Sequence, residues 1–420
     1  MKKPFQGSTD TSMSSPFKSY LPPHVRRDAR PNVTVNPTAD RDLLEGLKFH
    51  VTRIIPKPPL LDEGELKIKD LECIGSYNWL NTTQPTIIVP GSPPEWTNKP
   101  TPFKVEADTG PNYLDQNTYR SPSSSLLPLI RVVDIESPNF DWSSVDLITD
   151  RNGLRKLLRW LRSQDADCRE FRIDTQFCGE KTILFTRWEK RSVELLDGRF
   201  NRFGKPYQTY GFSFETASTQ PVVGCEGSTG HHRIICYDFA GLKLVVRFEV
   251  DSCIRQPRSK LSSNSEIDDL VEALGATTLS QETHGITVRR AGARVPQSNL
   301  IELATISQWQ VDKYDWRLET YPQMFLSQTP HHFLAVHEKG RFNKVEKRRL
   351  GTKDFVDAER DARGELWGLR KALVAIRDIL SAHGKDGRIS LVCRGGELEV
   401  YEMESTKSCL PKSLLGRFDS

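Results

Sequence analysis

The chain lacks the features that mark membrane and secreted proteins. No stretch of about 18 apolar residues, the length that crosses a bilayer, occurs in its 420 residues. The N-terminal segment MKKPFQGSTDTSMSSPF has two lysines but no apolar core behind them, so it is not a secretory signal. We therefore expect a protein of the nucleus, the cytoplasm or both, with no membrane partner.

Cysteine motifs, internal repeats and a strong net charge are also absent. The eight cysteines contain no Cys-x-x-Cys pair, which in an intracellular protein predicts buried free thiols and no bridges. The formal net charge of +4 is too small to indicate a nucleic-acid-binding protein by itself. Two local runs, residues 151–162 and 339–349, are more basic. Such runs are usually solvated faces, and contact with phosphate is the alternative.

Composition divides the chain into a tail and one large domain. Residues 1–40 are rich in Ser, Pro, Lys and Asn with little periodicity, which predicts a disordered tail. Residues 41–415 are long enough for a single domain. Residues 255–298 are polar with one short helical patch, and we interpret them as an insertion in that domain.

Strand-like patterns dominate the centre of the chain and helical patterns flank them. Alternation predicts strands at residues 171–177, 181–188, 210–215, 233–239, 242–253, 299–307 and 332–336, and a hairpin at 388–403. Helical spacing of apolar residues predicts helices at 152–161, 316–328 and 357–381. This order favours an α+β fold with a mixed β-sheet core.

Two carboxylates lie on one face of the strand that begins at Leu242. Alternation places Lys243, Arg247, Glu249 and Asp251 on that face, and the opposite face is entirely apolar. Like charges so close together are best tolerated when a divalent cation lies between them. Edge-strand charges that face water are the alternative interpretation.

A second strand carries an isolated charge. Glu302 shares its face with Leu300, Ala304 and Ile306, and a lone carboxylate on an apolar face needs a partner. A metal ion shared with Asp251 would supply one.

These segments, in this order, resemble the motifs of the decapping exoribonuclease family, the DXO-type decapping nucleases. The matching segments are Leu71 to Tyr77, Ile148-Thr149-Asp150-Arg151, Gly211-Phe212-Ser213-Phe214-Glu215, Glu249-Val250-Asp251 with Cys253 nearby, Glu302-Leu303-Ala304-Thr305, and Gln323-Met324-Phe325-Leu326 followed by Pro330. Each match is short, and together they span roughly residues 70–345. The resemblance implies two packed sheets flanked by helices, and metal-dependent hydrolysis at RNA 5′ ends by decapping, pyrophosphohydrolysis or removal of NAD caps, with 5′-to-3′ degradation in some members.

The resemblance also implies roles for individual residues. Glu215, Asp251 and Glu302 would bind one or two Mg²⁺ or Mn²⁺ ions, and all three are hard oxygen donors, as those cations require. The catalytic set would include Glu249, acting through water, and Gln323. Arg151 and Gln323 would contact the RNA phosphates. A 5′-3′ exoribonuclease would be the protein partner.

Two departures from the family pattern bear on activity. The segment between the Asp251 strand and the Glu302 strand is longer than in the family. Ala304 stands where the family has lysine, on the face of Glu302, and alanine can hold neither the attacking water nor the phosphate. Arg247 is then the candidate replacement, because its guanidinium lies two residues before Glu249 on the same face.

Two functions of different classes follow. One is a metal-dependent hydrolase of RNA 5′ ends, weakened by Ala304. The other is a pseudo-nuclease that keeps the fold and binds RNA or stabilises a partner. We favour the hydrolase because the metal ligands contribute more to this chemistry than one positioning group. His231, His232, Cys225 and Cys236 match no zinc-module spacing, so we interpret them as structural residues.

Overall fold

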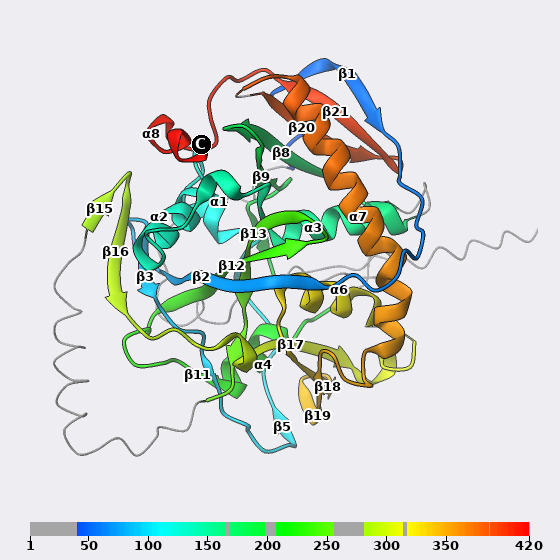
Figure 1. The fold of residues 1–420 in the computed structure, drawn as a ribbon. Coiled ribbons are helices and arrows are strands. Elements are labelled where there is room, and N and C mark those ends of the chain that lie inside the picture. The colour runs from blue at the N-terminus through cyan, green and yellow to red at the C-terminus, as the bar shows by residue number, and fades with distance from the viewer. Residues whose placement is uncertain are drawn as a thin grey trace, which may run out of the picture.

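A computed structural model of the chain describes residues 40–163, 168–197, 207–255, 281–313, 317–385 and 387–419 (Figure 1). The tail expected at 1–40 lies outside these ranges except for its last residue, as do residues 256–280 of the expected insertion. The eight cysteines were expected to be buried; in the described part all are free thiols, of which five are buried and three are half-buried. None of the described helices is long and apolar enough to cross a membrane.

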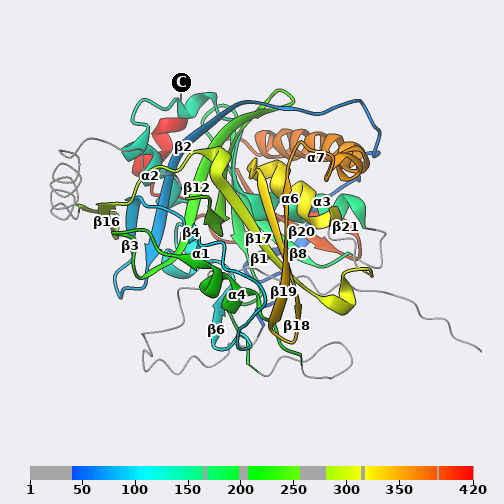
Figure 2. The ribbon, with the colours of Figure 1, turned by 90° about the horizontal axis from the view of Figure 1, so that it is seen from below.

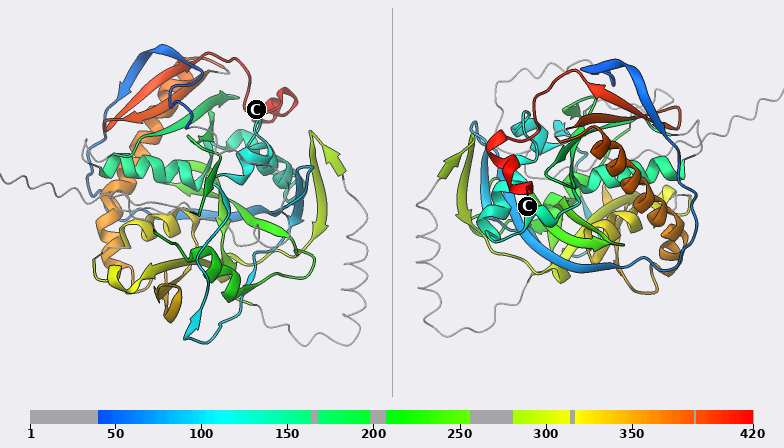
Figure 3. Two further views of the ribbon diagram at one scale, coloured as in Figure 1. Left: turned by 180° about the vertical axis from the view of Figure 1, so that it is seen from behind. Right: turned by 45° about the horizontal axis from the view of Figure 1, so that its top comes forward.

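The largest element is a mixed sheet of twelve strands. In spatial order these are β1 (Leu47–Ile55), β21 (Glu397–Met403), β20 (Arg388–Arg394), β8 (Phe171–Cys178), β9 (Thr182–Trp188), β7 (Leu147–Asp150), β13 (Leu242–Val250), β12 (Ser228–Phe239), β2 (Ile68–Leu80), β3 (Thr86–Pro90), β16 (Ile286–Ala291) and β15 (Gln281–Thr283). Strand β13 lies in the middle of this sheet. β1, β20 and β21 form one end of the sheet, and β15 and β16 form the other (Figure 3).

A second sheet of seven strands completes the core. Its order is β11 (Thr219–Gln220), β4 (Glu95–Trp96), β14 (Ser252–Cys253), β17 (Leu300–Ser307), β18 (His331–Glu338), β19 (Arg341–Arg349) and β5 (Phe103–Lys104), and β6 (Pro111–Tyr113) with β10 (Val193–Leu195) forms a small separate pair. Because β14 follows β13 after a single residue, the chain passes from the first sheet to the second at Asp251. The carboxylate of Asp251 therefore lies where the two sheets meet.

Helices cover the sheets on both sides. The α-helices are α1 (Gln116–Arg120), α2 (Leu127–Glu136), α3 (Arg151–Arg162), α4 (Gly211–Ser218), α6 (Arg317–Ser327), α7 (Val356–Ala382) and α8 (Lys412–Leu415), with short 3₁₀ turns at Trp142–Ser144, Gln297–Asn299, Gln308–Gln310 and Gly416–Phe418. Helices α3, α6 and α7 gather on one side of the molecule (Figure 2). Leu154, Leu157 and Leu161 of α3 belong to the same apolar core as Leu366 and Leu369 of α7. The α+β fold with a mixed sheet core is thus confirmed.

Local chemistry explains the β12–β13 hairpin on which the site depends. Ala240 and Gly241 both have positive φ angles, 51° and 86°, as a two-residue turn between twisted strands requires. Leu242, Leu244 and Val246 face one apolar core, while Val245 faces a second core beneath α2. Both faces of this strand are therefore covered, and its register is fixed.

One predicted strand is wrong. Residues 210–215 were expected to be extended, but Gly211–Ser218 forms helix α4. The carboxylate of Asp108 accepts hydrogen bonds from the backbone N–H of Ser213, at 2.9 Å, and of Phe212. These contacts satisfy two of the N–H groups that a helix start leaves free. Because Asp108 is about a hundred residues distant in sequence, the local pattern gave no sign of them.

The far end of the expected insertion is part of the large sheet. β16 pairs in parallel with β3, and β15 pairs with β16. The sequence analysis predicted no strands within residues 255–298, so β15 and β16 were missed.

Candidate functional site

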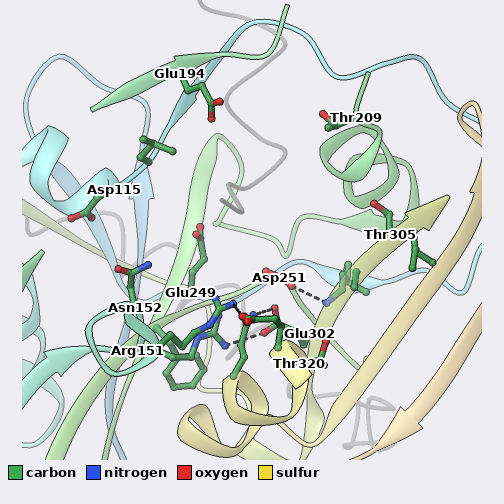
Figure 4. Close-up of a pocket in the computed structure, with 18 of the residues that line it drawn as sticks. Asp115, Arg151, Asn152, Glu194, Thr209, Glu249, Asp251, Glu302, Thr305 and Thr320 are labelled. Carbon is green, nitrogen blue, oxygen red and sulfur yellow. Dashed lines mark hydrogen bonds and ion pairs between the residues drawn. The ribbon is translucent and has the colours of Figure 1, made fainter. Parts of the chain in front are cut away.

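The junction of the two sheets opens into a cleft of about 1470 Å³. Its walls come from α3, the end of β13, β17 and α6, so the segments with predicted site residues meet there (Figure 4). The cleft is lined by six of the seven predicted site residues, namely Arg151, Arg247, Glu249, Asp251, Glu302 and Gln323, together with Ala304. Glu215 is the exception and lies behind the wall.

Glu302 is held by two donors that sequence reasoning had assigned to RNA. Arg151 Nη1 donates to Glu302 Oε2 at 3.0 Å and to Ser327 Oγ at 3.2 Å. Gln323 Nε2 donates to the other oxygen, Oε1, of Glu302. Glu302 is only 5% exposed, so this pairing offsets much of the cost of burying its charge. Both carboxylate oxygens of Glu302 are engaged by protein groups in this structure.

Asp251 is fixed by the backbone of the neighbouring strand. Its Oδ2 accepts a hydrogen bond from the N–H of Leu303 at 2.8 Å. Burial and the nearby charge of Glu302 raise the pKa of Asp251 well above its ordinary value. In Figure 4, Asp251 lies with Glu249 and Glu302 around the same part of the cleft. Ser252 pairs with Ile301 across the two strands, and Asp251 and Glu302 both line the cleft.

Glu215 and Glu249 each carry a buried carboxylate oxygen without a partner. The Oε1 atom of each has no hydrogen-bond donor among the described residues. Burial raises the pKa of Glu249 to about 8. Burial and the charge of Asp251 raise the pKa of Glu215, a side chain only 1% exposed, well above its ordinary value. A buried acceptor left unpaired is costly, and such atoms mark places where a ligand is expected.

These carboxylates have the chemistry of a divalent-cation site, although they do not yet enclose one. Glu215, Glu249, Asp251 and Glu302 supply the hard oxygen donors that Mg²⁺ and Mn²⁺ prefer. No three His, Cys, Asp or Glu side chains in the described ranges are placed so that they could hold one metal ion together. Both oxygens of Glu302 accept hydrogen bonds from Arg151 and Gln323. The donor types suit a divalent cation.

Arg247 has a different environment from the one expected for a phosphate-binding residue. Its Nε and Nη2 donate to the two carboxylate oxygens of Asp150 at 2.6 and 2.9 Å. Its Nη1 donates to the carbonyl of Ser125 at 2.8 Å and to the hydroxyl of Tyr77 at 3.3 Å. The side chain is fully buried. Its guanidinium is therefore paired with Asp150, immediately before α3. This pairing does not support the expectation that Arg247 contacts phosphate in place of the missing lysine.

Ala304 lies where alternation predicted, on the cleft face of β17. It packs beside Ile306, Leu334 and Val336 and is partly exposed to the cleft. The wall of the cleft at this point is therefore apolar.

Glu319, which pairs with the basic face of α3, was not predicted as a site residue. Glu319 on α6 forms ion pairs with Arg155, Arg159 and Arg162 at 3.5, 3.3 and 3.4 Å. This part of the basic run at 151–162 is therefore bound to a carboxylate, and only partly solvated. Because Arg155, Arg159 and Glu319 also line the cleft, they extend the charged surface away from the carboxylates.

A second cluster of charged side chains that line the cleft was also missed. Lys156 and Arg187 form ion pairs with Glu189 at 3.1 and 2.6 Å. Burial opposes the charge of Glu189, but the two cations lower its pKa to about 2.

His232, which we interpreted as structural, is a buried strand residue of β12 that also lines the cleft. Burial lowers the pKa of His232 to about 3, so the imidazole is neutral.

Solved structures with the same fold are Rai1 proteins. Candida albicans Rai1 in complex with pU5-Mn²⁺ has a TM-score of 0.57 at 12% identity, over 88% of this chain and 99% of that one. S. pombe Rai1 has a TM-score of 0.53 at 13% identity, over 83% and 97%. Scheffersomyces stipitis Rai1 has a TM-score of 0.50 at 13% identity, over 87% and 97%. Their coverage includes nearly the whole of each Rai1 chain.

The fold is therefore that of the DXO-type decapping nucleases, as the motifs had indicated. Within that fold, the chain belongs to the family described as a domain of unknown function (DUF8563), whose profile matches residues 66–418. No curated protein matches the sequence.

Proposed function

We propose that this protein is a divalent-metal-dependent hydrolase that acts on RNA 5′ ends. The observation that carries the proposal is the pair of buried, unpartnered carboxylate oxygens of Glu215 and Glu249 beside Asp251. They lie in the fold of Rai1, and the Candida albicans structure contains pU5-Mn²⁺. Carboxylates kept together at this cost fit a site for Mg²⁺ or Mn²⁺.

Glu215 and the predicted site residues that line the cleft have separate roles in this proposal. Glu215, Asp251 and Glu302 hold the cation, and Glu249 acts through water. A bound divalent cation supplies a water molecule of lowered pKa and stabilises charge on the phosphate. Leu303 N–H fixes Asp251, and Gln323 orients Glu302. Arg151, released from Glu302, contacts the RNA phosphate.

The proposal is tested with RNAs that differ only at the 5′ end. Wild-type protein is incubated with 5′-triphosphate, 5′-monophosphate and NAD-capped RNA in Mn²⁺, in Mg²⁺ and in EDTA, and the products are identified by mass. We expect metal-dependent release from at least one of these ends, and loss of that release in Asp251→Asn. Equal product with and without metal, or equal rates in both proteins, contradicts the proposal.

The second candidate function is that of an RNA-binding or partner-stabilising pseudo-nuclease. Two observations favour it: Ala304 leaves the cleft wall apolar, and Glu302 already has two protein partners. In this case a 5′-3′ exoribonuclease is the proposed partner. RNA binding without product formation in any metal supports this alternative.

The domain organisation and location stay proposals. We propose one domain at 41–415 with an insertion at about 255–298, and a protein of the nucleus or cytoplasm.

Metal binding is expected to release protons and to strengthen as pH rises. Without metal, the folded-state pKa of Glu249 is about 8, above its unfolded value, so the carboxyl is protonated at pH 7. Glu249 therefore makes the metal-free fold less stable as the pH rises from the pKa that Glu249 has in the unfolded chain to about 8. Mn²⁺ affinity should increase between pH 6 and 8 by roughly tenfold per pH unit for each proton displaced. Calorimetry in buffers of different ionisation enthalpy counts the protons.

The control for this pH dependence is Glu249→Gln. It should release one proton fewer and show a shallower dependence. A Mn²⁺ affinity that is constant from pH 6 to 8 would contradict the assignment of these carboxylates to the metal.

Arg151→Ala is expected to change metal and RNA binding in opposite directions. Removing the guanidinium frees the carboxylate of Glu302 and removes a positive charge close to the bound cation. One neighbouring charge typically shifts the binding of an ion to a carboxylate by about 1–3 log units. Mn²⁺ should therefore bind about tenfold more tightly or better. RNA should bind more weakly, with a smaller salt dependence. Arg151→Lys, which keeps the charge without the bidentate geometry, is the matched control. RNA affinity that is unchanged at every salt concentration would exclude Arg151 from the RNA site.

A further inference from the structure

A second groove lies on the opposite face of the seven-stranded sheet from the cleft. Its volume is about 630 Å³. Strand β18 separates the two cavities by alternation: His332 and Leu334 line the cleft, whereas His331 and Phe333 line the groove. The other walls come from β4, the end of β19 and residues 352–354. The groove is therefore a separate surface that the proposed hydrolysis does not use.

The floor of the groove is aromatic. The rings of Trp96 and Phe333 meet edge to face, with centroids 5.2 Å apart. The ammonium of Lys347 lies 5.1 Å from the Phe333 ring and 6.0 Å from the Trp96 ring, and it donates to Asn98 Oδ1 at 2.6 Å. His331 is half-buried beside Phe333. Phe333 is buried, whereas Trp96 and His331 are partly exposed. Partly exposed rings next to fixed cations form a surface on which bases can stack.

The rim of the groove is strongly basic. Five cationic side chains and one carboxylate line it, namely Arg255, Lys347, Arg348, Arg349, Lys353 and Asp354. Arg255 and Arg348 have acidic partners in Glu95 and Glu346. Within the described part of the chain, Lys347, Arg349 and Lys353 form no ion pair with a carboxylate. A concentration of unneutralised cations in a chain of net charge +4 indicates an anionic ligand.

We propose that this groove binds single-stranded RNA, independently of the cleft. The cations contact the phosphates, and Trp96 and His331 stack with bases. An acidic peptide would match the charge but would leave the rings unused. The choice of RNA over DNA rests on the proposed function. The inference that the groove binds a single-stranded nucleic acid rests on its own residues. The groove thus holds the body of an RNA strand apart from its 5′ end.

The test is fluorescence anisotropy with a 5′-hydroxyl oligouridine in EDTA. This probe has no 5′ phosphate to process and needs no metal, so a failure here is distinct from a failure to hydrolyse. The double variant Lys347→Gln/Arg349→Gln removes two exposed charges of the groove. The control, Arg341→Gln/Lys344→Gln, removes two exposed charges from the same strand outside the groove.

The groove variant should bind the oligouridine about tenfold more weakly, with the slope of log affinity against log salt reduced by about 1.4, or roughly 0.7 for each lost phosphate contact. The control variant should bind like the wild type. Equal loss in both double variants, or no loss in either, overturns the proposal. If polyglutamate displaces the RNA and its own binding depends more strongly on Lys347 and Arg349, the groove is a protein-docking site instead.

Discussion

Ala304→Lys is expected to raise metal-dependent hydrolysis of RNA 5′ ends by roughly 10²–10⁴-fold, the contribution of one well-placed proton-transfer or electrostatic group. Ala304 faces the cleft from the strand position two residues after Glu302, so a lysine there would point to the same side of the strand. Its ammonium could hold the attacking water or the phosphate. The measurement is the single-turnover rate on 5′-triphosphate RNA in Mn²⁺.

The matched control is Ala304→Met, which has similar bulk and no charge. It should leave the rate unchanged, because the native apolar wall already lacks a cation. If Ala304→Lys binds metal but stays inert, the pseudo-nuclease alternative is favoured over a hydrolase weakened at this position.

Arg247→Met is expected to destabilise the fold by about 3–5 kcal/mol, the usual cost of breaking a buried ion pair from one side. The substitution leaves Asp150 without its bidentate partner and also removes the hydrogen bonds to Ser125 and Tyr77. Because Asp150 precedes α3 directly, the start of that helix should loosen. Denaturant unfolding of wild type and variant measures the difference.

The double variant Asp150→Asn/Arg247→Met separates the two roles of Arg247. The added Asp150→Asn substitution removes the unpaired negative charge of Asp150, so the double variant should recover part of the lost stability. If Arg247→Met instead unfolds like the wild type and loses only hydrolysis, Arg247 acts on the substrate, as the strand pattern alone had suggested.

The strands of the core were predictable because burial on one or both faces leaves a clear sequence pattern. β8, β9, β12, β13 and β17 all follow the alternation or apolar runs read from the sequence. Helix α4 was not predictable, because its start depends on Asp108, which is distant in sequence. Short segments with mixed spacing are decided by such tertiary contacts.

The candidate site was predictable in its members and less so in their partners. Alternation gave Glu249, Asp251 and Glu302 as neighbours on two strands, and the motif order added Glu215, Arg151 and Gln323. Neither pattern could show that Arg151 and Gln323 donate hydrogen bonds to Glu302, because a contact between separate elements leaves no periodic signal in the sequence. The same limit applies to Arg247, whose position on the strand was correct and whose partner, Asp150, lies on a different strand.

Anomalous diffraction from crystals grown in Mn²⁺ tests the central claim most directly. We expect one or two manganese peaks among Glu215, Asp251 and Glu302, with the carboxylate of Glu302 turned away from Arg151. The same data from Asp251→Asn crystals should show these peaks lost or much reduced. A wild-type map at the same Mn²⁺ concentration without a peak among these carboxylates, and with Glu302 still paired to Arg151, would contradict the metal centre and the function built on it.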